Sequence, residues 1–282
     1  MTRTVYSLRK PENHRACIVL NSAHSGRDYP EPMVAASNLS TTQLRSSEDA
    51  YVDELFGAAP GLGVPMLSAN FPRAFVDVNR ASDELDPALI QGISKRSMNP
   101  RVACGLGVIP RVVAEGREIR AGKMTLMAAK TRLSKYYWPY HRQLTHLLDE
   151  TQKAFGSVLL LDCHSMPSQA GGADPIPYDI ILGDRFGASC GGDLMDIAES
   201  FFADAGFNTG RNAPFAGAHL AQKYGSPLVG RHVIQIEVNR GLYLDEVTVA
   251  KSELFSDVQS RLTGVLAALI DHLSPKAAMA AE

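Results

Sequence analysis

The chain has 282 residues, of which 45% are hydrophobic, and its 28 basic side chains nearly balance 30 acidic ones. This length and composition are typical of a folded protein with a sizeable core and argue against a disordered chain. A formal net charge of -2 gives no global field that would favour nucleic acid or an anionic membrane as a partner.

Residues 1–10 carry charge and lack the apolar core of a secretion signal, and no stretch approaches the ~20 apolar residues needed to cross a bilayer. The four cysteines are widely separated and form no C-x-x-C pair, which argues against a disulfide framework and against a thiolate zinc site. We therefore expect a cytoplasmic protein without a membrane partner.

Short apolar runs that end in small or polar residues predict strands, and the continuous ones predict strands buried on both faces of a sheet. In chain order the predicted strands are 16–20, 74–78, 158–161, 178–182 and 233–238. Helical patterns between them predict helices over 47–58, 126–155, 192–205 and 247–273. This alternation predicts an α/β fold, a mixed β-sheet flanked by helices on both faces. No linker divides the chain, so we expect a single domain over residues 1–282, with a frayed tail from 274 to 282.

Two long stretches, 84–122 and 167–177, have no clear period and are rich in Gly and Pro. Long irregular connections of this kind are usually functional, so we expect both to form the rim or lid of a pocket.

Two histidines follow predicted strands in similar contexts, His24 after the run VLNSA and His164 after LLLDC. Ligands of open α/β sheets bind beyond the carboxyl ends of the strands, so both imidazoles could reach one metal ion. The alternative is that each imidazole forms a hydrogen bond within its own turn. The repeated context favours the metal site.

A zinc site in a hydrolase usually has three protein ligands, and two histidines with one carboxylate form a common set. Nearby carboxylates lie in the predicted helix 47–58, where Asp49 falls in the first turn and Asp53 lies one turn later on the same face. Acidic residues in a first turn also stabilise any helix through its dipole. Asp49 is the predicted third ligand, and Asp53 is the alternative.

The segment around the second predicted strand is rich in groups that bind carboxylates. Alternation places Arg73 and Asp77 on one side of that strand, with Asn79 and Arg80 beyond its end. A guanidinium binds a carboxylate through two charge-assisted hydrogen bonds, which indicates a small anionic substrate. Surface ion pairs are the alternative for either arginine.

The last predicted strand carries Gln235, Glu237 and Asn239 on one face of an otherwise apolar run. A carboxylate is costly to bury unless it is paired or active in catalysis. Glu237 could move protons as a general acid/base beside a metal site, or it could form an ion pair with Arg240 or Arg231.

Taken in order, these clusters resemble the N-formylglutamate amidohydrolase family, whose fold is similar to that of zinc carboxypeptidases and aspartoacylase. The matching segments lie between about residue 18 and residue 245 and read NSAHSGRDYP, EDAYVDELF, PRAFVDVNR, YYWPYH, LLLDCHSMP, PFAGAHLAQKYG and IEVNRGLY. The resemblance implies a hydrolase-like fold of the zinc carboxypeptidase type. It also implies hydrolysis of the formamide of an N-formyl amino acid, N-formyl-L-glutamate in the family, late in histidine degradation.

The resemblance also implies a role for each site residue. One Zn2+ ion would be bound by His24, His164 and an acidic residue, but the related sites place that acid three residues after the first histidine, where this chain has Arg27. Asp49 is therefore the expected third ligand. The remaining implied roles are Glu237 as the group that activates water, Arg73 as the group that polarises the carbonyl, Asn79 and Arg80 as carboxylate ligands, and His141 and His219 as residues of the pocket wall.

Several alternatives stay open on the sequence alone. Another enzymatic activity would be a zinc carboxypeptidase or deacylase with a different substrate, and a non-enzymatic function would be the binding of an anionic amino acid. A serine hydrolase using Ser25 or Ser165 is disfavoured, because neither lies in a G-x-S-x-G elbow. Three arginines, Arg101, Arg111 and Arg117, could each meet a second substrate carboxylate. The protein could be a monomer or a homodimer.

Overall fold

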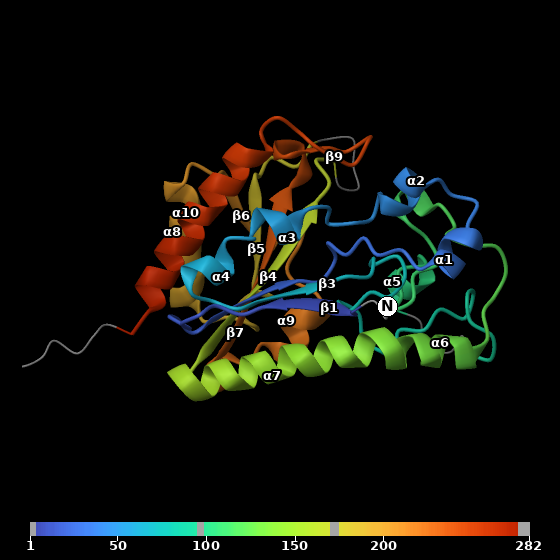
Figure 1. Cartoon of the computed structure of the whole chain (residues 1–282), viewed down its shortest axis with the longest axis horizontal. Helices are drawn as coiled ribbons and strands as arrows, with labels where there is room; N and C mark the ends of the chain where they lie inside the picture. The colour runs from blue at the N-terminus through green and yellow to red at the C-terminus, as the bar shows by residue number, and fades with distance from the viewer. Residues whose placement is uncertain (1–3, 95–98, 170–174, 276–282) are drawn as a thin grey trace, which may run out of the picture.

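The computed structural model describes residues 4–94, 99–169 and 175–275. Its centre is a seven-stranded sheet in the order β1-β3-β2-β4-β7-β5-β6 (Figure 1). The strands are β1 Tyr6–Arg9, β2 Ile18–Ser22, β3 Met66–Ala69, β4 Val158–Met166, β5 Ile180–Gly183, β6 Thr209–Arg211 and β7 Arg231–Asn239. The four central strands β3, β2, β4 and β7 are parallel, whereas β1 and β5 pair antiparallel with their neighbours β3 and β7. A small separate sheet pairs β8 Leu244–Asp245 with β9 Ala250–Lys251.

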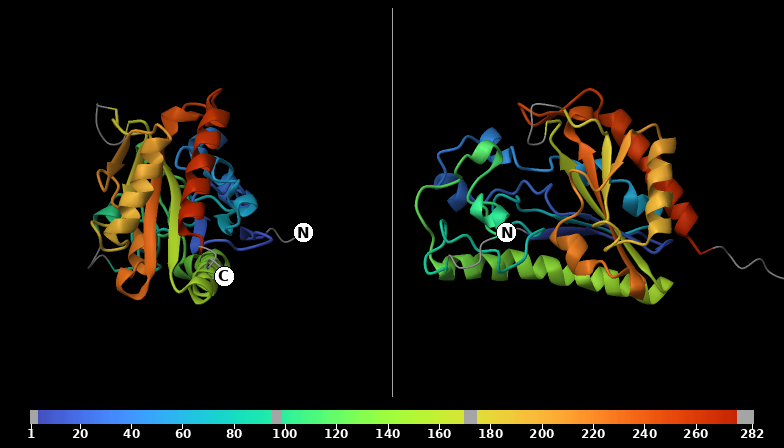
Figure 2. Two further views of the ribbon diagram at one scale, coloured as in Figure 1. Left: turned by 90° about the vertical axis from the view of Figure 1, so that its left-hand side faces the viewer. Right: turned by 180° about the vertical axis from the view of Figure 1, so that it is seen from behind.

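Helices cover both faces of the sheet, as the views in Figure 2 show. The α-helices are α1 Glu31–Ala35, α2 Thr41–Arg45, α3 Val52–Leu55, α4 Ala59–Leu62, α5 Pro100–Ala103, α6 Leu126–Arg132, α7 Trp138–Phe155, α8 Gly192–Asp204, α9 His219–Tyr224 and α10 Phe255–Leu273. Helices α3, α4, α8 and α10 pack on one face, and α7 and α9 pack on the other. The short helices α1, α2 and α5 lie at one end of the molecule, far from α8 and α10 (Figure 1). The mixed sheet with helices on both faces confirms the predicted fold class.

Alternation along the central strands divides the apolar core into two layers. In β4, Leu159 and Leu161 face the cluster that contains α8 and α10, whereas Leu160 faces the cluster that contains α7. Both faces are therefore apolar, which is why β4 reads as a continuous hydrophobic run. The same alternation carries His164 to the α7 side of the sheet, where the polar site lies.

Three predicted elements differ from the structure. Residues 74–78 form turns rather than a strand, and only the short helix α3 forms within the predicted helix 47–58, with turns on both sides of it. The predicted helix 247–273 begins only at Phe255, because residues before it form a turn and β9. The prediction of a frayed tail falls mainly on residues 276–282, which lie outside the described residues.

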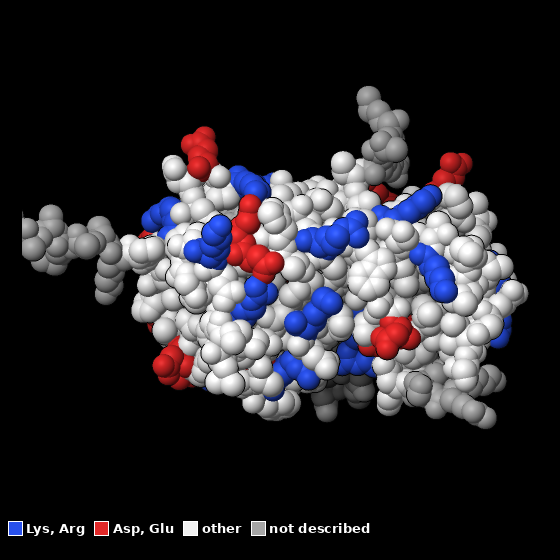
Figure 3. Space-filling view, turned by 90° about the horizontal axis from the view of Figure 1, so that it is seen from below, with Lys and Arg blue, Asp and Glu red and all other residues white. Residues whose placement is uncertain are grey.

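Within the described ranges, no helix combines the length and the apolarity needed to span a membrane. Figure 3 views the molecule from below, on the side of α6 and α7. Basic and acidic side chains are interspersed on this face rather than gathered into a field of one sign.

Candidate active site

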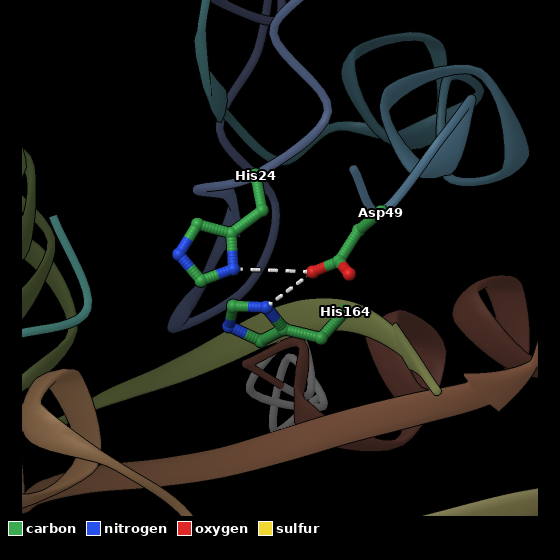
Figure 4. Close-up of side chains that lie close together, drawn as sticks. All are labelled: His24, Asp49 and His164. Carbon is green, nitrogen blue, oxygen red and sulfur yellow. Dashed lines mark hydrogen bonds and ion pairs between the residues drawn. The ribbon is translucent and has the colours of Figure 1, made fainter. Parts of the chain in front are cut away.

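Three buried side chains from distant parts of the chain meet at the carboxyl end of the parallel strands (Figure 4). His24 follows β2, Asp49 precedes α3, and His164 lies near the end of β4. Asp49 Oδ2 lies 3.2 Å from Nδ1 of His24 and 2.8 Å from Nδ1 of His164. The candidate ligand atoms all lie within 4.8 Å of one another, and each residue is at most 2% exposed. Two imidazoles and one carboxylate at this spacing form a donor set suited to zinc.

The other nitrogen of each imidazole faces a second carboxylate. Nε2 of His24 lies 2.7 Å from Oδ1 of Asp77, and Nε2 of His164 lies 3.0 Å from Oδ2 of Asp162. A carboxylate partner of this kind orients an imidazole ring and, when the histidine binds a metal, accepts the proton of the nitrogen that faces away from the ion. Asp162 is itself held by the amide of Asn21 at 2.7 Å. These contacts fix both imidazoles with Nδ1 turned toward Asp49, in a group that could hold a metal ion.

Asp49 reaches this position because the chain before α3 is not helical. Its backbone N–H donates to the carbonyl oxygen of His24 at 3.1 Å, and Tyr51 takes a left-handed conformation with a φ of 62° just before α3 begins at Val52. The prediction that Asp49 belongs to the first turn of a helix is therefore wrong. The non-helical path carries its carboxylate into the space between the two histidines.

The carboxylate of Asp49 is ionised despite complete burial. Burial raises its pKa, but hydrogen bonds from His164 and His24 and their charges outweigh that effect and hold the pKa well below the ordinary value. Arg240 also donates to Asp49 Oδ1 through Nη2 at 3.0 Å. An ionised carboxylate is the form that binds a metal.

Asp53, the alternative ligand, lies apart from this cluster. Its two carboxylate oxygens lie 3.0 and 2.9 Å from Nη2 of Arg27, and its side chain is 25% exposed. The structure brings Asp49 to the histidines and pairs Asp53 with Arg27.

Arg73 lies on an irregular segment at the edge of the metal-ligand cluster. Its Nη2 donates to Asp77 Oδ2 at 3.0 Å, and its Nη1 lies 3.9 Å from Asp49 Oδ1. Asp77 thus bridges Arg73 and His24. The strand predicted here is wrong, but Arg73 and Asp77 do lie together, as that prediction expected.

Glu237 lies in β7 directly opposite His164 in the sheet register. Gln235 Nε2 donates to Glu237 Oε1 at 2.7 Å, and Gln235 Oε1 accepts from the backbone N–H of Ala218 at 3.0 Å. Burial is the main cause that raises the pKa of Glu237 to about 7. Near neutral pH this carboxyl group can therefore both accept and donate a proton. The ion pair considered between Arg240 and Glu237 is not formed, since Arg240 binds Asp49 instead.

Asn79 and Arg80 stand beside the histidines. The Asn79 amide nitrogen lies 3.3 Å from His164 Nε2, while its amide oxygen accepts from the backbone N–H of Leu220 at 2.8 Å. Arg80 donates from Nε to the carbonyl oxygen of Leu106 at 3.0 Å. No hydrogen bond joins its other guanidinium nitrogens to a described residue, so they are free to bind an anion.

These side chains line one cavity of about 720 Å³. The carboxyl-terminal parts of the central strands and the turns after them contribute His24, His164, Ser165, Gln235 and Glu237 to its lining. The rim includes residues from 101–116 and 214–218. The first irregular stretch thus contributes to the rim as predicted. Pro167 contributes from the second, of which residues 170–174 lie outside the described residues.

A model of the N-formylglutamate amidohydrolase family matches residues 16–244, a span that contains the whole cluster. The chain belongs to this family. N-formylglutamate deformylase from Pseudomonas aeruginosa is 29% identical over 242 residues, which cover 82% of this chain and 84% of that protein. The N-formylglutamate deformylase of Pseudomonas putida is 29% identical over 234 residues, covering 79% and 80% of the two chains.

The crystal structure of N-formylglutamate amidohydrolase from Ralstonia eutropha JMP134 matches with a TM-score of 0.89 and 33% identity, and covers 95% of this chain and 98% of that one. Together with the family match, this likeness shows that the chain is a hydrolase that acts on amide bonds. The resemblance inferred from the sequence is confirmed.

Two histidines of the predicted pocket wall lie outside the residues that line the amidohydrolase cavity. His219 borders a neighbouring cavity and lies 3.3 Å from the hydroxyl of Tyr137. His141 is 3% exposed, with Nδ1 2.8 Å from the hydroxyl of Tyr224 and Nε2 3.1 Å from the carbonyl oxygen of Val78. His141 therefore supports the segment that carries Asn79 from behind.

The burial of His141 predicts a measurable pH dependence of stability. Burial, aided by the charge of Lys223, lowers the pKa of His141 from 6.5 to about 3. The unfolded chain takes up this proton at higher pH than the folded one does. The free energy of unfolding should therefore fall as the pH drops from 6.5 toward 3, by up to about 1.4 kcal/mol per pH unit from this group.

Urea denaturation at a series of pH values tests this expectation. In His141→Gln the slope between about pH 4 and pH 6.5 should be shallower than in the wild type. His146→Gln is a matched control, because this histidine lies on the same helix with its side chain 60% exposed. Equal slopes in all three proteins would show that His141 titrates normally.

Asp77, Asp162 and Arg240 contact His24, His164 and Asp49 in the amidohydrolase site, and the sequence alone does not predict these contacts. Asp162 could have been found by alternation, since it lies two residues before His164 on the same face of β4. The position of Arg240 depends on the turn after β7, where the 3₁₀ helix Arg240–Leu242 begins, and no local pattern indicates that its side chain reaches Asp49.

Proposed function

We propose that this amidohydrolase binds one zinc ion through His24, Asp49 and His164 and cleaves the formamide bond of an N-formyl amino acid, most effectively N-formyl-L-glutamate. The observation that carries the proposal is the arrangement of the two histidines, which turn Nδ1 toward one shared carboxylate and Nε2 toward Asp77 and Asp162. The names of its relatives support the substrate class. Such an activity would serve histidine degradation by releasing formate and glutamate.

Each residue of the cavity has its own role in the proposed reaction. A zinc ion held at this site supplies a Lewis acid that activates water and polarises a carbonyl group. Glu237 accepts a proton from the attacking water and returns it to the leaving nitrogen, a role that suits its pKa near neutrality. Arg73 places a positive charge beside Asp49, where it stabilises negative charge that develops on the formyl oxygen. Ser25 and Ser165 take no covalent part.

The cavity also offers two free cations for a substrate with two carboxylates. Arg80 lies within the cavity beside Asn79, and Arg101 lines both this cavity and its neighbour. Arg111 is paired with Asp86 at 2.9 Å, and Arg117 is paired with Glu115. No hydrogen bond or ion pair joins the side chain of Arg101 to another described residue. Of the three candidate arginines, Arg101 is therefore the one suited to bind the side-chain carboxylate, while Arg80 and Asn79 bind the α-carboxylate.

This assignment predicts a selective effect of Arg101→Gln. For N-formyl-L-glutamate, kcat/KM should fall by about 10-fold to 100-fold, since a charge-assisted hydrogen bond contributes about 1.5–3 kcal/mol. For N-formyl-L-norvaline, which lacks the second carboxylate, kcat/KM should change little. Arg117→Gln is the matched control and should leave both substrates unaffected. An equal loss for both substrates would exclude a role of Arg101 in side-chain recognition.

Metal analysis coupled to a formate-release assay over a panel of N-formyl amino acids tests the function as a whole. The proposal expects about one zinc per chain and preferred turnover of N-formyl-L-glutamate. Preferred release of amine from acetyl or peptidyl substrates would identify a deacylase or carboxypeptidase instead. Binding of zinc and N-formyl-L-glutamate without turnover would indicate a binding protein.

A further inference from the structure

A second cavity, of about 700 Å³, lies beside the active site. We refer to it as the side cavity. It lies between α1, the stretch 109–124 and the helical segment 125–136. Apolar side chains form most of its lining, among them Met33, Phe75, Leu89, Ile109, Ile119 and Met124. These walls suit an apolar body, and the flexible methionine side chains can adapt to its shape.

The charged side chains that line the side cavity are all basic. Arg120, Arg132 and Lys135 line it, and no aspartate or glutamate does so among the described residues. Arg132 donates from Nη1 to the carbonyl oxygen of Phe75 at 3.1 Å, and its guanidinium lies 4.0 Å from the centre of the Phe75 ring. Neither contact neutralises its charge.

Arg120 adds an unsatisfied donor to this cavity. Its Nε is buried and has no hydrogen-bond partner among the described residues. Burial and then the nearby charge of Arg120 lower the pKa of Arg132 to about 10, so Arg132 stays charged at neutral pH. Neither Arg120 nor Arg132 forms an ion pair with a described residue. Both arginines are half-buried, and a cation enclosed by apolar side chains is normally paired, because an unpaired charge in an apolar setting is costly. An anionic group in the side cavity could pair with both arginines.

We propose that the side cavity binds an organic carboxylate with an apolar body, held by Arg120 and Arg132 through its carboxylate and by the apolar walls through its body. A small inorganic anion would leave those walls facing water, and a neutral apolar molecule would leave the arginines unpaired. The doubly charged substrate of the proposed function does not suit this lining either. The site is thus distinct from the substrate cavity.

The two cavities nevertheless share a wall, since Ala74 and Pro110 line both. Ala74 follows Arg73 directly in the chain, and the carbonyl of Phe75 is the group that Arg132 holds. An occupant of the side cavity would therefore touch the segment that presents Arg73 to the active site.

Isothermal titration of the whole protein with sodium octanoate tests the proposal, with octan-1-ol and sodium acetate as matched probes. Octanoate should bind with a Kd of about 0.1–1 mM, as expected for a ligand of this size. Octan-1-ol, which lacks the charge, and acetate, which lacks the body, should each bind at least about 10-fold more weakly. Absence of octanoate binding at concentrations on the order of 10 mM would overturn the proposal, as would equal affinity for octanoate and octan-1-ol.

Two variants locate the site. Arg120→Gln should weaken octanoate binding by about 10-fold and leave octan-1-ol unaffected, because one charge-assisted contact is lost. Ala128→Glu places a carboxylate on the exposed face of α6, four residues before Arg132, where it can pair with that arginine and compete with octanoate. Arg142→Gln, on an exposed position of α7, is the control and should bind as the wild type does. Wild-type octanoate affinity in both Arg120→Gln and Ala128→Glu would place binding elsewhere.

Discussion

Glu237→Gln should retain its metal and lose turnover by a factor on the order of 10² to 10⁴, the usual contribution of a general acid/base group. The glutamine side chain has nearly the same shape and can still meet Gln235, which lies 2.7 Å from Glu237 Oε1. It cannot carry a proton from water to the leaving nitrogen. Formate release and elemental analysis on the same preparation separate loss of proton transfer from loss of metal.

The matched control for this experiment is Glu150→Gln, which changes a half-exposed glutamate on α7 away from the cavity. Its activity should equal that of the wild type. Near-normal turnover in Glu237→Gln would remove Glu237 from the mechanism. A fall in zinc content that parallels the fall in activity would instead assign Glu237 to the support of the metal ligands.

The pH profile of the wild type provides a second view of Glu237. Its carboxyl group must be ionised to accept a proton, and burial raises its pKa to about 7. The acidic limb of kcat/KM should therefore fall as the pH drops below neutrality rather than near the ordinary value of 4.5.

The central strands could be predicted from the sequence because burial on both faces leaves a continuous apolar run, as in β4 and β7. The strands β1, β3 and β6 were not predicted. Each has only three or four residues, and half of β1 is exposed, so none of the three forms an extended apolar run. Their places in the sheet depend on pairing with distant segments.

The wrongly predicted strand at 74–78 shows why local alternation can mislead. Every residue of this segment is buried, and its apolar residues share a core cluster with Val108 and Ile109. The backbone N–H of Asp77 donates to the carbonyl oxygen of Val108 at 2.9 Å, a contact with a segment that has no pattern of its own. The residues of this segment are apolar because it is buried under other parts of the chain, and they do not indicate a β-strand.

The structure groups His24, Asp49 and His164 as the sequence predicts, but the backbone that carries them differs from the prediction. His24 does follow β2, but His164 lies inside β4, which continues to Met166, rather than beyond its end. Asp49 was chosen for a place in a helix that does not exist. Histidines near the ends of predicted strands indicated a metal site. The left-handed conformation of Tyr51, which ends the non-helical segment that carries Asp49, cannot be predicted from local helix propensity.

Asp49→Ala should lose the metal almost completely, whereas Asp53→Ala should keep it. Without Asp49, the two histidines retain their Nδ1 atoms but lose the carboxylate between them, and two neutral imidazoles bind zinc far more weakly than a three-ligand site does. Arg240 would also lose its partner at 3.0 Å and leave a positive charge beside the site. Elemental analysis after dialysis, with formate release measured in parallel, should show both zinc and activity near background.

Asp53→Ala is the discriminating control, because it removes a carboxylate only four residues further along the chain. Its loss breaks the contact with Arg27, which is partly exposed, and such surface pairs contribute about 0–1 kcal/mol to stability. Zinc content should therefore stay at the wild-type level. Loss of zinc in Asp53→Ala together with its retention in Asp49→Ala would reverse the ligand assignment. That result would require a chain path before α3 different from the one that places Asp49 against His24 and His164.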